Sequence, residues 1–349
     1  MNKYFYLILS FVFLALHTTT VQAGNPDRQG EAGAYELLMN PWAKSAGLHT
    51  MGTSMITGVE AMRLNVAGLS RINSSEFVIG HARYLEGTDI KMNAFGLAQR
   101  IGKNGAIGVS LMALDFGEIP VTTTDQPEGT GGTFSPSFFN LGLSYAHTFE
   151  NKVSVGLTLR AISESIADLN AFGFAVDAGV QYVTGPKDQF KFGISLRNIG
   201  TEMKFAGEGL STQLAPPSGD GGDQLTYNVR VSGFELPSVL NVGVSYDFLL
   251  NAKNRLTAIG NFTANSFSRD QIGGGLEYAF NEMFMLRGGY KYDFGQNEAE
   301  ASVYTGLSGG LSVVVPFKKG SASKVAIDYA YRATNPWGGT HNFAVRLMF

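Results

Sequence analysis

The residues that most often carry catalysis or bind metals are few in this chain and widely spaced. The sequence contains no Cys, which excludes thiolate nucleophiles, disulfide frameworks and Cys-ligated zinc, iron–sulfur or haem sites. No two of its five His have the helical or strand spacing that suits a shared metal ion; they are His17, His49, His81, His147 and His341. We therefore expect structural or interfacial His and predict no metal site.

Two glycine-rich stretches and one acidic loop are the remaining candidates for chemistry. Residues 273–275 and 288–289 lie in expected strands and open no helix, so their Gly are better suited to packing and curvature than to phosphate binding. Asp125 and Glu128 have the oxygen atoms that a cation needs, but the nearby Gly and Pro favour a turn. The sequence predicts neither an enzyme nor a cofactor.

Composition narrows the class of protein further. The 349 residues include 44 Gly, 25 Phe, 14 Tyr and 2 Trp, which is ample material for a folded domain and excludes disorder. A formal net charge of −3 argues against nucleic acid as a partner, because such binders usually have a basic face. After the first residues of the chain, no apolar run approaches the roughly 20 residues that a membrane helix needs.

The first 23 residues have the features of a secretory signal peptide. Lys3 precedes an apolar stretch at residues 4–16, and Ala23 ends a segment of the kind that a signal peptidase cleaves. The apolar stretch is too short for a membrane anchor. We expect export, with cleavage after Ala23.

Most of the remaining chain alternates apolar and polar residues with the period of a β-strand. In one example, Leu157 and Leu159 alternate with Thr158 and Arg160, so that apolar and polar side chains lie on opposite faces. Fourteen strands are expected, near residues 76–85, 89–101, 105–116, 137–149, 152–164, 171–183, 190–200, 236–249, 254–267, 270–280, 283–294, 304–317, 323–332 and 340–349.

The lengths of the connections distinguish a membrane barrel from a soluble sandwich. Numbered in order, the even connections are short, whereas every long connection is odd: residues 117–136, 201–235, 295–303 and 333–339. A soluble sandwich has no reason to sort loops in this way, but outer-membrane barrels have short periplasmic turns and long external loops. We predict an all-β fold: a transmembrane antiparallel β-barrel of about 14 strands over residues 76–349, in the outer membrane of a Gram-negative bacterium.

The two faces of these strands suit a polar lumen and a lipid exterior. Outward positions are almost wholly apolar, so lipid is the expected surrounding, and aromatic residues gather at expected strand ends as an interfacial girdle: Phe149, Phe190, Phe248, Phe280, Tyr331 and Phe349. The charged residues expected to point inward are Arg160, Asp177, Arg197, Asp247, Glu277, Lys291, Asp293, Asp328, Arg332 and Arg346.

The ends of the mature chain differ from the strands between them. Residues 24–75 do not alternate, and apolar side chains such as Leu37, Leu38 and Met39 favour burial over a disordered tail. We expect a short helical plug inside or under the barrel. Phe349 is a terminal aromatic on an amphipathic strand, which is similar to the signal that outer-membrane assembly machinery recognises, although it is also simply the end of a last strand.

Motifs in this N-terminal segment resemble those of the PorV/PorQ family, whose usual signature is Met-Gly-Gly followed by Asn-Pro-Ala-Gly-Leu. The matching residues are Met51, Gly52, Asn65, Ala67 and Gly68, with Thr53 and Val66 at two positions that differ. Further similarity at residues 114–120, 131–136, 143–146, 177–180 and 197–200 extends the resemblance over most of the mature chain.

The resemblance implies a FadL-like barrel that belongs to the type IX protein secretion system. Its partners would be an SprA-like translocon barrel or attachment-complex proteins, together with the C-terminal signal domains of secreted protein substrates. The connections at residues 117–136 and 201–235 would then form an external docking surface, unless they merely cap the barrel. Apolar anchors on that surface would be Phe134, Phe138, Phe139, Phe205 and Phe234.

The alternative function is a FadL-like channel for hydrophobic small molecules. Such a channel needs an apolar pocket in the lumen and a lateral opening, for which the candidate is an interruption of the third strand at Gly117 and Pro120. An open diffusion porin is less consistent with the sequence, because the expected plug would block the lumen.

Overall fold

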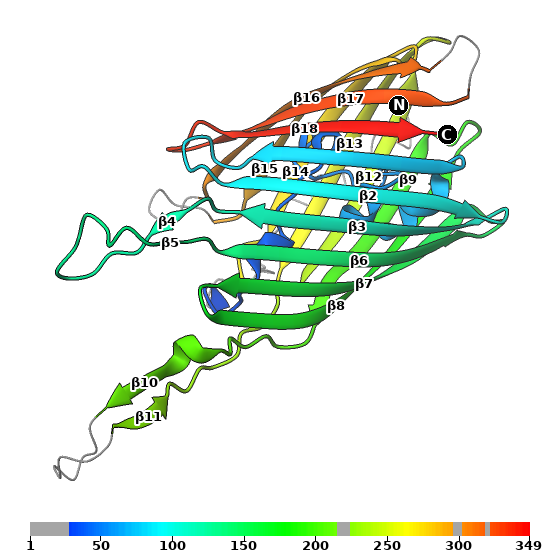
Figure 1. The fold of residues 1–349 in the computed structure, drawn as a ribbon. Helices are drawn as coiled ribbons and strands as arrows, with labels where there is room; N and C mark the ends of the chain where they lie inside the picture. Colours follow the sequence, from blue (N-terminus) through cyan, green and yellow to red (C-terminus); the bar gives the residue numbers. More distant parts are fainter. Residues whose placement is uncertain (1–27, 215–223, 296–301, 318–321) are drawn as a thin grey trace.

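Fourteen strands form one closed barrel. Figure 1 shows the barrel from the side. The computed structural model describes residues 28–214, 224–295, 302–317 and 322–349. Consecutive strands of the barrel pair antiparallel, and the first strand, β1, pairs with the last, β18, to close it. The predicted all-β barrel is confirmed. The predicted signal peptide, residues 1–23, lies outside the described residues.

The strands of the barrel begin and end close to the predicted positions. Their bounds are β1 Ser75–Arg83, β2 Lys91–Ile101, β3 Gly105–Asp115, β6 Ser137–Thr148, β7 Val153–Ile166, β8 Leu169–Thr184, β9 Phe190–Gly200, β12 Val239–Leu249, β13 Asn254–Asn265, β14 Gln271–Phe280, β15 Phe284–Asp293, β16 Tyr304–Pro316, β17 Lys324–Thr334 and β18 Thr340–Met348. The strands β7 and β8 run a little further than predicted, because a tight turn with Ala167 at φ 47° joins them.

Two small ribbons in the long connections were not predicted. One pairs β4 (Ile119–Pro120) with β5 (Thr133–Phe134), and the other pairs β10 (Ser211–Leu214) with β11 (Leu225–Asn228), next to the short helix η4 (Glu208–Leu210). Figure 1 shows both ribbons extending beyond the same end of the barrel. We call this the long-loop end and the opposite one the short-turn end.

The two faces of the wall have the polarity that a membrane requires. In β8, every second side chain is buried: Asp177 and Gln181 point into the lumen, whereas Phe172 and Phe174 are more than half exposed on the outside. The charged residues predicted to point inward are all buried or half-buried. Because such an apolar exterior is unfavourable in water and favourable in acyl chains, the outer surface is suited to lipid.

A short segment of helices and turns, residues 28–74, fills the lumen; we call it the plug. Its helices are η2 (Tyr35–Leu37), α2 (Ala43–Ala46), α3 (Ala61–Leu64) and η3 (Val66–Arg71), and Figure 1 shows parts of it in blue within the barrel. No helix among the described residues is long and apolar enough to cross a bilayer. Hydrogen bonds join the plug to several parts of the wall, including Ser54 Oγ to Ser245 Oγ at 3.0 Å on β12 and Ser308 Oγ of β16 to the Gly47 carbonyl at 3.3 Å.

The start of the plug is tied to the connection that carries β10 and β11. The backbone N–H of Gly33 donates to the carbonyl of Glu235 at 3.0 Å, and Arg28 forms an ion pair with the Glu235 carboxylate at 2.7 Å. The ring of Phe234 lies directly against Gly33, where any side chain would clash with it. The plug and the base of this long connection are therefore packed as one unit.

Candidate functional site

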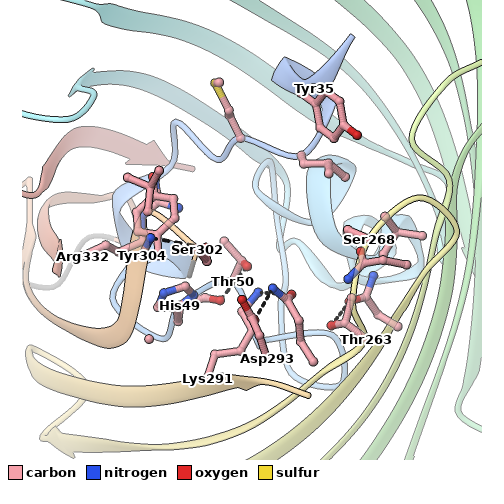
Figure 2. A pocket seen from close by; sticks show the side chains of 18 of the residues that line it. Tyr35, His49, Thr50, Thr263, Ser268, Lys291, Asp293, Ser302, Tyr304 and Arg332 are labelled. Atoms are coloured by element: carbon pink, nitrogen blue, oxygen red, sulfur yellow. Dashed lines mark hydrogen bonds between the residues drawn. The ribbon is translucent and has the colours of Figure 1, made fainter. Parts of the chain in front are cut away.

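A cavity of about 310 Å³ lies between the plug and the barrel wall (Figure 2). Its wall residues come from the parts of the strands nearest the long connections: Asn265 is the last residue of β13, Asp293 is the last of β15, and Tyr304 is the first of β16. The plug contributes Tyr35, Leu38, Met39, His49 and Thr50. The cavity therefore lies at the long-loop end of the lumen.

Positive charge dominates the lining. Of the residues that the structure describes, three cationic side chains, Arg197, Lys291 and Arg332, line the cavity, against one carboxylate, Asp293. Gln271 stands between two of these charges: Lys291 Nζ donates to its Oε1 at 3.0 Å, and its Nε2 donates to Asp293 Oδ1 at 2.7 Å. Among the described residues, Lys291 Nζ makes no other hydrogen bond, so two of its three N–H donors remain for another acceptor.

The two arginines are fixed by the plug but retain donor capacity. Arg332 Nη2 donates to the Asn40 carbonyl at 3.3 Å, and its guanidinium carbon lies 4.7 Å from the centre of the Tyr304 ring. Arg197 Nη1 donates to the Arg63 carbonyl at 2.6 Å. In both arginines Nε is buried and has no hydrogen-bond partner among the described residues. A buried donor without a partner is costly and is normally satisfied by water or a ligand.

His49 reaches the cavity from a strained turn of the plug. His49 has φ 49° and Thr50 has φ 62°, a left-handed conformation that is unfavourable for side chains of these types and especially for a β-branched residue. The imidazole lies edge-on to the Tyr304 ring with centroids 5.5 Å apart, and neither ring nitrogen has a partner among the described residues. Burial, reinforced by the charges of Lys291 and Arg332, holds the pKa of His49 well below its usual range, so the ring is neutral at pH 7.

Buried ion pairs away from the cavity join neighbouring strands of the wall, so their charges are not free to bind a ligand. One of these residues, Arg160 of β7, contacts the plug as well: its Nη2 donates a hydrogen bond to the Met62 carbonyl at 3.2 Å. The buried pairs are Arg160–Asp177 at 2.7 Å, Arg287–Glu277 at 2.6 Å and Arg346–Asp328 at 3.1 Å. Among the described residues, no group of three or more His, Asp or Glu is arranged to hold a metal ion.

The five family-motif residues shape the plug and do not line the cavity. They are Met51, Gly52, Asn65, Ala67 and Gly68, and all five are buried. The amide nitrogen of Asn65 donates to the carbonyls of Thr53 at 2.9 Å and of Val180, on β8, at 3.0 Å. A Cβ atom on Gly68 would lie only 2.0 Å from the Ile56 carbonyl oxygen, which explains a glycine there.

The five predicted docking anchors have different surroundings. Phe134 is half-buried in the β4–β5 ribbon, and Phe139 faces outward from β6 with 37% of its surface exposed. Phe138 packs against one buried apolar cluster, and Phe205 and Phe234 pack against another that includes plug residues. The structure brings Phe205 and Phe234 together, with ring centroids 5.8 Å apart, but directs them toward the plug. Their role as docking anchors stays a prediction.

Two further predictions concern the wall. The backbone N–H of Phe349 donates to the Ser75 carbonyl at 2.9 Å, next to the seam between β1 and β18; its role as an assembly signal stays a prediction. The lateral opening considered at Gly117 and Pro120 is not found there. The strand β3 pairs with β2 and β6 along its whole length, and both residues lie beyond its end.

Sequence reasoning found some of the cavity residues and missed others. It placed Arg197, Lys291, Asp293 and Arg332 in the lumen from their alternation with apolar residues, but gave them no common site. For His49 the sequence predicts a structural or interfacial role. The residue types of uncharged lining residues such as Gln271 and Tyr304 do not indicate a binding site. Only their positions at expected strand ends, next to the long connections, could have suggested one.

Solved structures of other proteins share this architecture. The toluene transporter TbuX of Ralstonia pickettii gives a TM-score of 0.56 at 15% sequence identity, covering 88% of this chain and 97% of that one. The toluene transporter TodX of Pseudomonas putida gives a TM-score of 0.56 at 14% identity, with the same coverage of 88% and 97%. A FadL homologue of Pseudomonas aeruginosa gives a TM-score of 0.52 at 12% identity, again with 88% and 97% covered.

At such low identities these comparisons concern the fold alone. No protein-family model matches the chain, and no curated protein matches its sequence. The PorV/PorQ resemblance therefore stays a prediction that rests on the motifs themselves. The chain has the FadL-like fold of outer-membrane β-barrels.

Proposed function

We propose that this protein is an uptake channel in the outer membrane of a Gram-negative bacterium, which admits a small molecule through a plugged lumen. The observation that carries the proposal is the cavity between plug and wall at the long-loop end. In outer-membrane barrels the long loops face the outside, so this cavity would be the first enclosed site that an incoming molecule reaches. The fold is that of proteins described as toluene transporters, which supports a small aromatic or otherwise hydrophobic ligand.

Passage through this barrel requires the plug to move. Residues of the plug are buried against the wall around the lumen, and hydrogen bonds such as Ser54–Ser245 and Asn65–Val180 join the two. The transport cycle would therefore alternate between this closed state and one in which part of the plug is displaced. A plug that is covalently fixed to the wall should not transport.

The absence of native Cys makes this requirement directly testable with an engineered disulfide. Ser54 of the plug and Ser245 of β12 have Oγ atoms 3.0 Å apart, so the double variant Ser54→Cys/Ser245→Cys should form a bond between plug and wall. Ser238 and Ser266 have Oγ atoms 2.7 Å apart at the long-loop end and involve no plug residue, so their double Cys variant is a matched control.

The measurement is uptake of labelled aromatic compounds by Gram-negative host cells that make each variant. We expect oxidation to abolish uptake through the Ser54–Ser245 variant, and a reductant to restore it, while the control transports in both states. Undiminished uptake through the oxidised plug-to-wall variant would contradict a channel gated by the plug.

As a second candidate function, we propose docking of a protein partner, as the PorV/PorQ resemblance implies for type IX secretion. The observation in its favour is the β10–β11 ribbon, which extends away from the barrel and exposes Leu214, Leu225, Tyr227 and Val229. An apolar group of this kind on a projecting ribbon suits a protein partner such as a translocon barrel, an attachment-complex protein or a secreted substrate.

Deleting residues 206–230 tests the docking proposal, provided that surface expression of the barrel is unchanged. Loss of partner co-purification and a secretion defect would support docking, and unchanged recovery of the partner would argue against it. A defect in growth on aromatic or fatty-acid carbon sources with intact protein secretion would favour the channel instead.

A further inference from the structure

We infer that the cavity at the long-loop end binds a small aromatic carboxylate, with the carboxylate against Lys291 and Arg332 and the ring among the tyrosines of the lining. This inference adds a ligand class to the proposed uptake function. Only the passage of the ligand through the barrel rests on that function. The binding site itself is argued from the lining residues.

The positive charge of the described lining favours an anionic ligand. Among the described lining residues the one carboxylate, Asp293, already accepts a hydrogen bond from Gln271 at 2.7 Å, whereas in the same part of the chain Lys291 has spare donors and Arg332 has a buried Nε without a partner. Guanidinium and ammonium groups bind carboxylates through short, charge-assisted hydrogen bonds. A ligand carboxylate would supply the acceptor that these groups lack.

The remaining lining suits an aromatic ring. Tyr35, Tyr84 and Tyr304 line the cavity together with apolar side chains such as Leu38 and Val239. Figure 2 shows Tyr304 and Arg332 close together on one side and Tyr35 across the space from them. Aromatic side chains contact other rings favourably edge-on or with an offset.

The size of the cavity limits the ligand further. An engineered cavity of about 150 Å³ holds benzene, so about 310 Å³ has room for a substituted ring with its carboxylate and a few waters. A long acyl chain would need an extended apolar tunnel, whereas the described lining alternates apolar with charged and amide side chains. The site therefore fits a compact anion better than a fatty acid.

A neutral hydrocarbon fits this lining poorly. It would remove water from Lys291 and Arg332 without replacing the hydrogen bonds, and desolvating an unpaired charge is costly. The proteins of similar fold include one described as a monoaromatic hydrocarbon channel. The cationic lining predicts that this chain prefers the carboxylate over the hydrocarbon of the same ring.

The experiment compares benzoate with benzyl alcohol and toluene, which have the same ring but no charge, by calorimetric titration of the full-length protein in mild detergent. We expect benzoate to bind at least about tenfold more tightly than either neutral compound. Equal affinity for benzoate and benzyl alcohol would overturn the inference, and this comparison needs no variant.

Three variants then locate the site. Lys291→Met should weaken benzoate binding about tenfold or more, Lys291→Arg should retain it to within about threefold, and Lys324→Met should leave it unchanged. Lys324 is an exposed residue at the first position of β17, near the short-turn end, so it controls for loss of a lysine charge. Heat-modifiable migration on a gel confirms that each variant is folded. Unaltered benzoate affinity in folded Lys291→Met would overturn the assignment.

Binding and passage are measured separately, so that the two proposals can fail independently. Toluene uptake by cells without benzoate binding by the purified protein would overturn the carboxylate site and leave the channel. Benzoate binding without uptake of any aromatic compound would overturn the channel and leave the site.

Discussion

The plug has two flanks that differ in how they meet the wall. On one flank, η3 lies against β3, β6, β7 and β8, and buried side chains such as Val59, Met62 and Leu69 belong to a large apolar cluster. On the other flank, next to β13–β17, the buried apolar cluster consists of Leu48, Met51 and Ile259, and the cavity occupies the space beside it. We call these the packed flank and the cavity flank.

The difference indicates where the plug opens. Regions with few buried apolar contacts open locally at a lower free energy than densely packed ones. Each flank has a buried ion pair in the wall, Arg160–Asp177 on the packed flank and Arg287–Glu277 on the cavity flank, but Lys291 beside the cavity has no ion-pair partner among the described residues. We therefore expect the plug to hinge on the packed flank and to separate first from the cavity flank.

The largest expected effect comes from removing a charge on the packed flank. Arg160→Met should lower the free energy of unfolding by about 3–5 kcal/mol, because it leaves the buried Asp177 carboxylate unpaired. Its matched control is Lys152→Met, which breaks the solvent-exposed pair with Asp188 at 2.6 Å and should cost at most about 1 kcal/mol. Denaturant unfolding in detergent measures both. Equal losses would contradict a rigid packed flank.

A pH dependence should come from the same flank. Burial, followed by the neighbouring Glu164 carboxylate, raises the pKa of Glu36 from 4.5 to about 8. Between these values the folded protein holds a proton that the unfolded chain has released, so the free energy of unfolding falls as the pH rises through this window. At about 1.4 kcal/mol per pKa unit, the loss amounts to a few kcal/mol.

Replacing the titrating group tests this pH dependence. Glu36→Gln should flatten the fall in stability between about pH 5 and pH 8, whereas Glu31→Gln, at a more exposed position near the start of the plug, should not. Stability measured in denaturant at several pH values gives the comparison. An unchanged slope in Glu36→Gln would assign the dependence to other groups.

Substitutions of the motif glycines Gly52 and Gly68 should have a smaller and more local effect on stability. Gly68→Ala should cost about 1–3 kcal/mol, since its Cβ would lie 2.0 Å from the Ile56 carbonyl oxygen. At Gly52 the nearest atoms to an added Cβ are 3.8 Å away, so Gly52→Ala should change stability by less than about 1 kcal/mol. Thermal unfolding separates the two, and a similar loss in both would mean that the close contact at Gly68 relaxes easily.

The smallest effect is expected on the cavity flank. Lys291→Met should change the free energy of unfolding by at most about 1 kcal/mol, because it removes one hydrogen bond and leaves no unpaired carboxylate. The same denaturant experiment as for Arg160→Met makes the comparison direct. A loss of several kcal/mol would show that the two flanks are equally important for stability.

The barrel was predictable because its surroundings impose a period on the sequence. Lipid on one side and a polar lumen on the other require alternation, so Leu157 and Leu159 face outward while Thr158 and Arg160 are buried. The ribbons β4–β5 and β10–β11 were missed because strands of two to four residues are too short to show alternation.

The cavity could not be predicted from local sequence. It depends on which strands are neighbours, as when β14 places Gln271 opposite Asp293 of β15, and on how the plug lies against them. The positive φ values of His49 and Thr50 have no signature in residue type, since these positions hold neither Gly nor Asn. Residues from distant parts of the chain therefore form a site that spacing alone does not reveal.

The bonds between Gly33 and Glu235 give the β10–β11 ribbon a mechanical connection to the interior. A force that displaces the base of this ribbon acts on the first residues of the plug through the backbone hydrogen bond, the Arg28 ion pair and the Phe234 ring. A partner protein that pulls on the ribbon would therefore also pull the first residues of the plug out of the lumen.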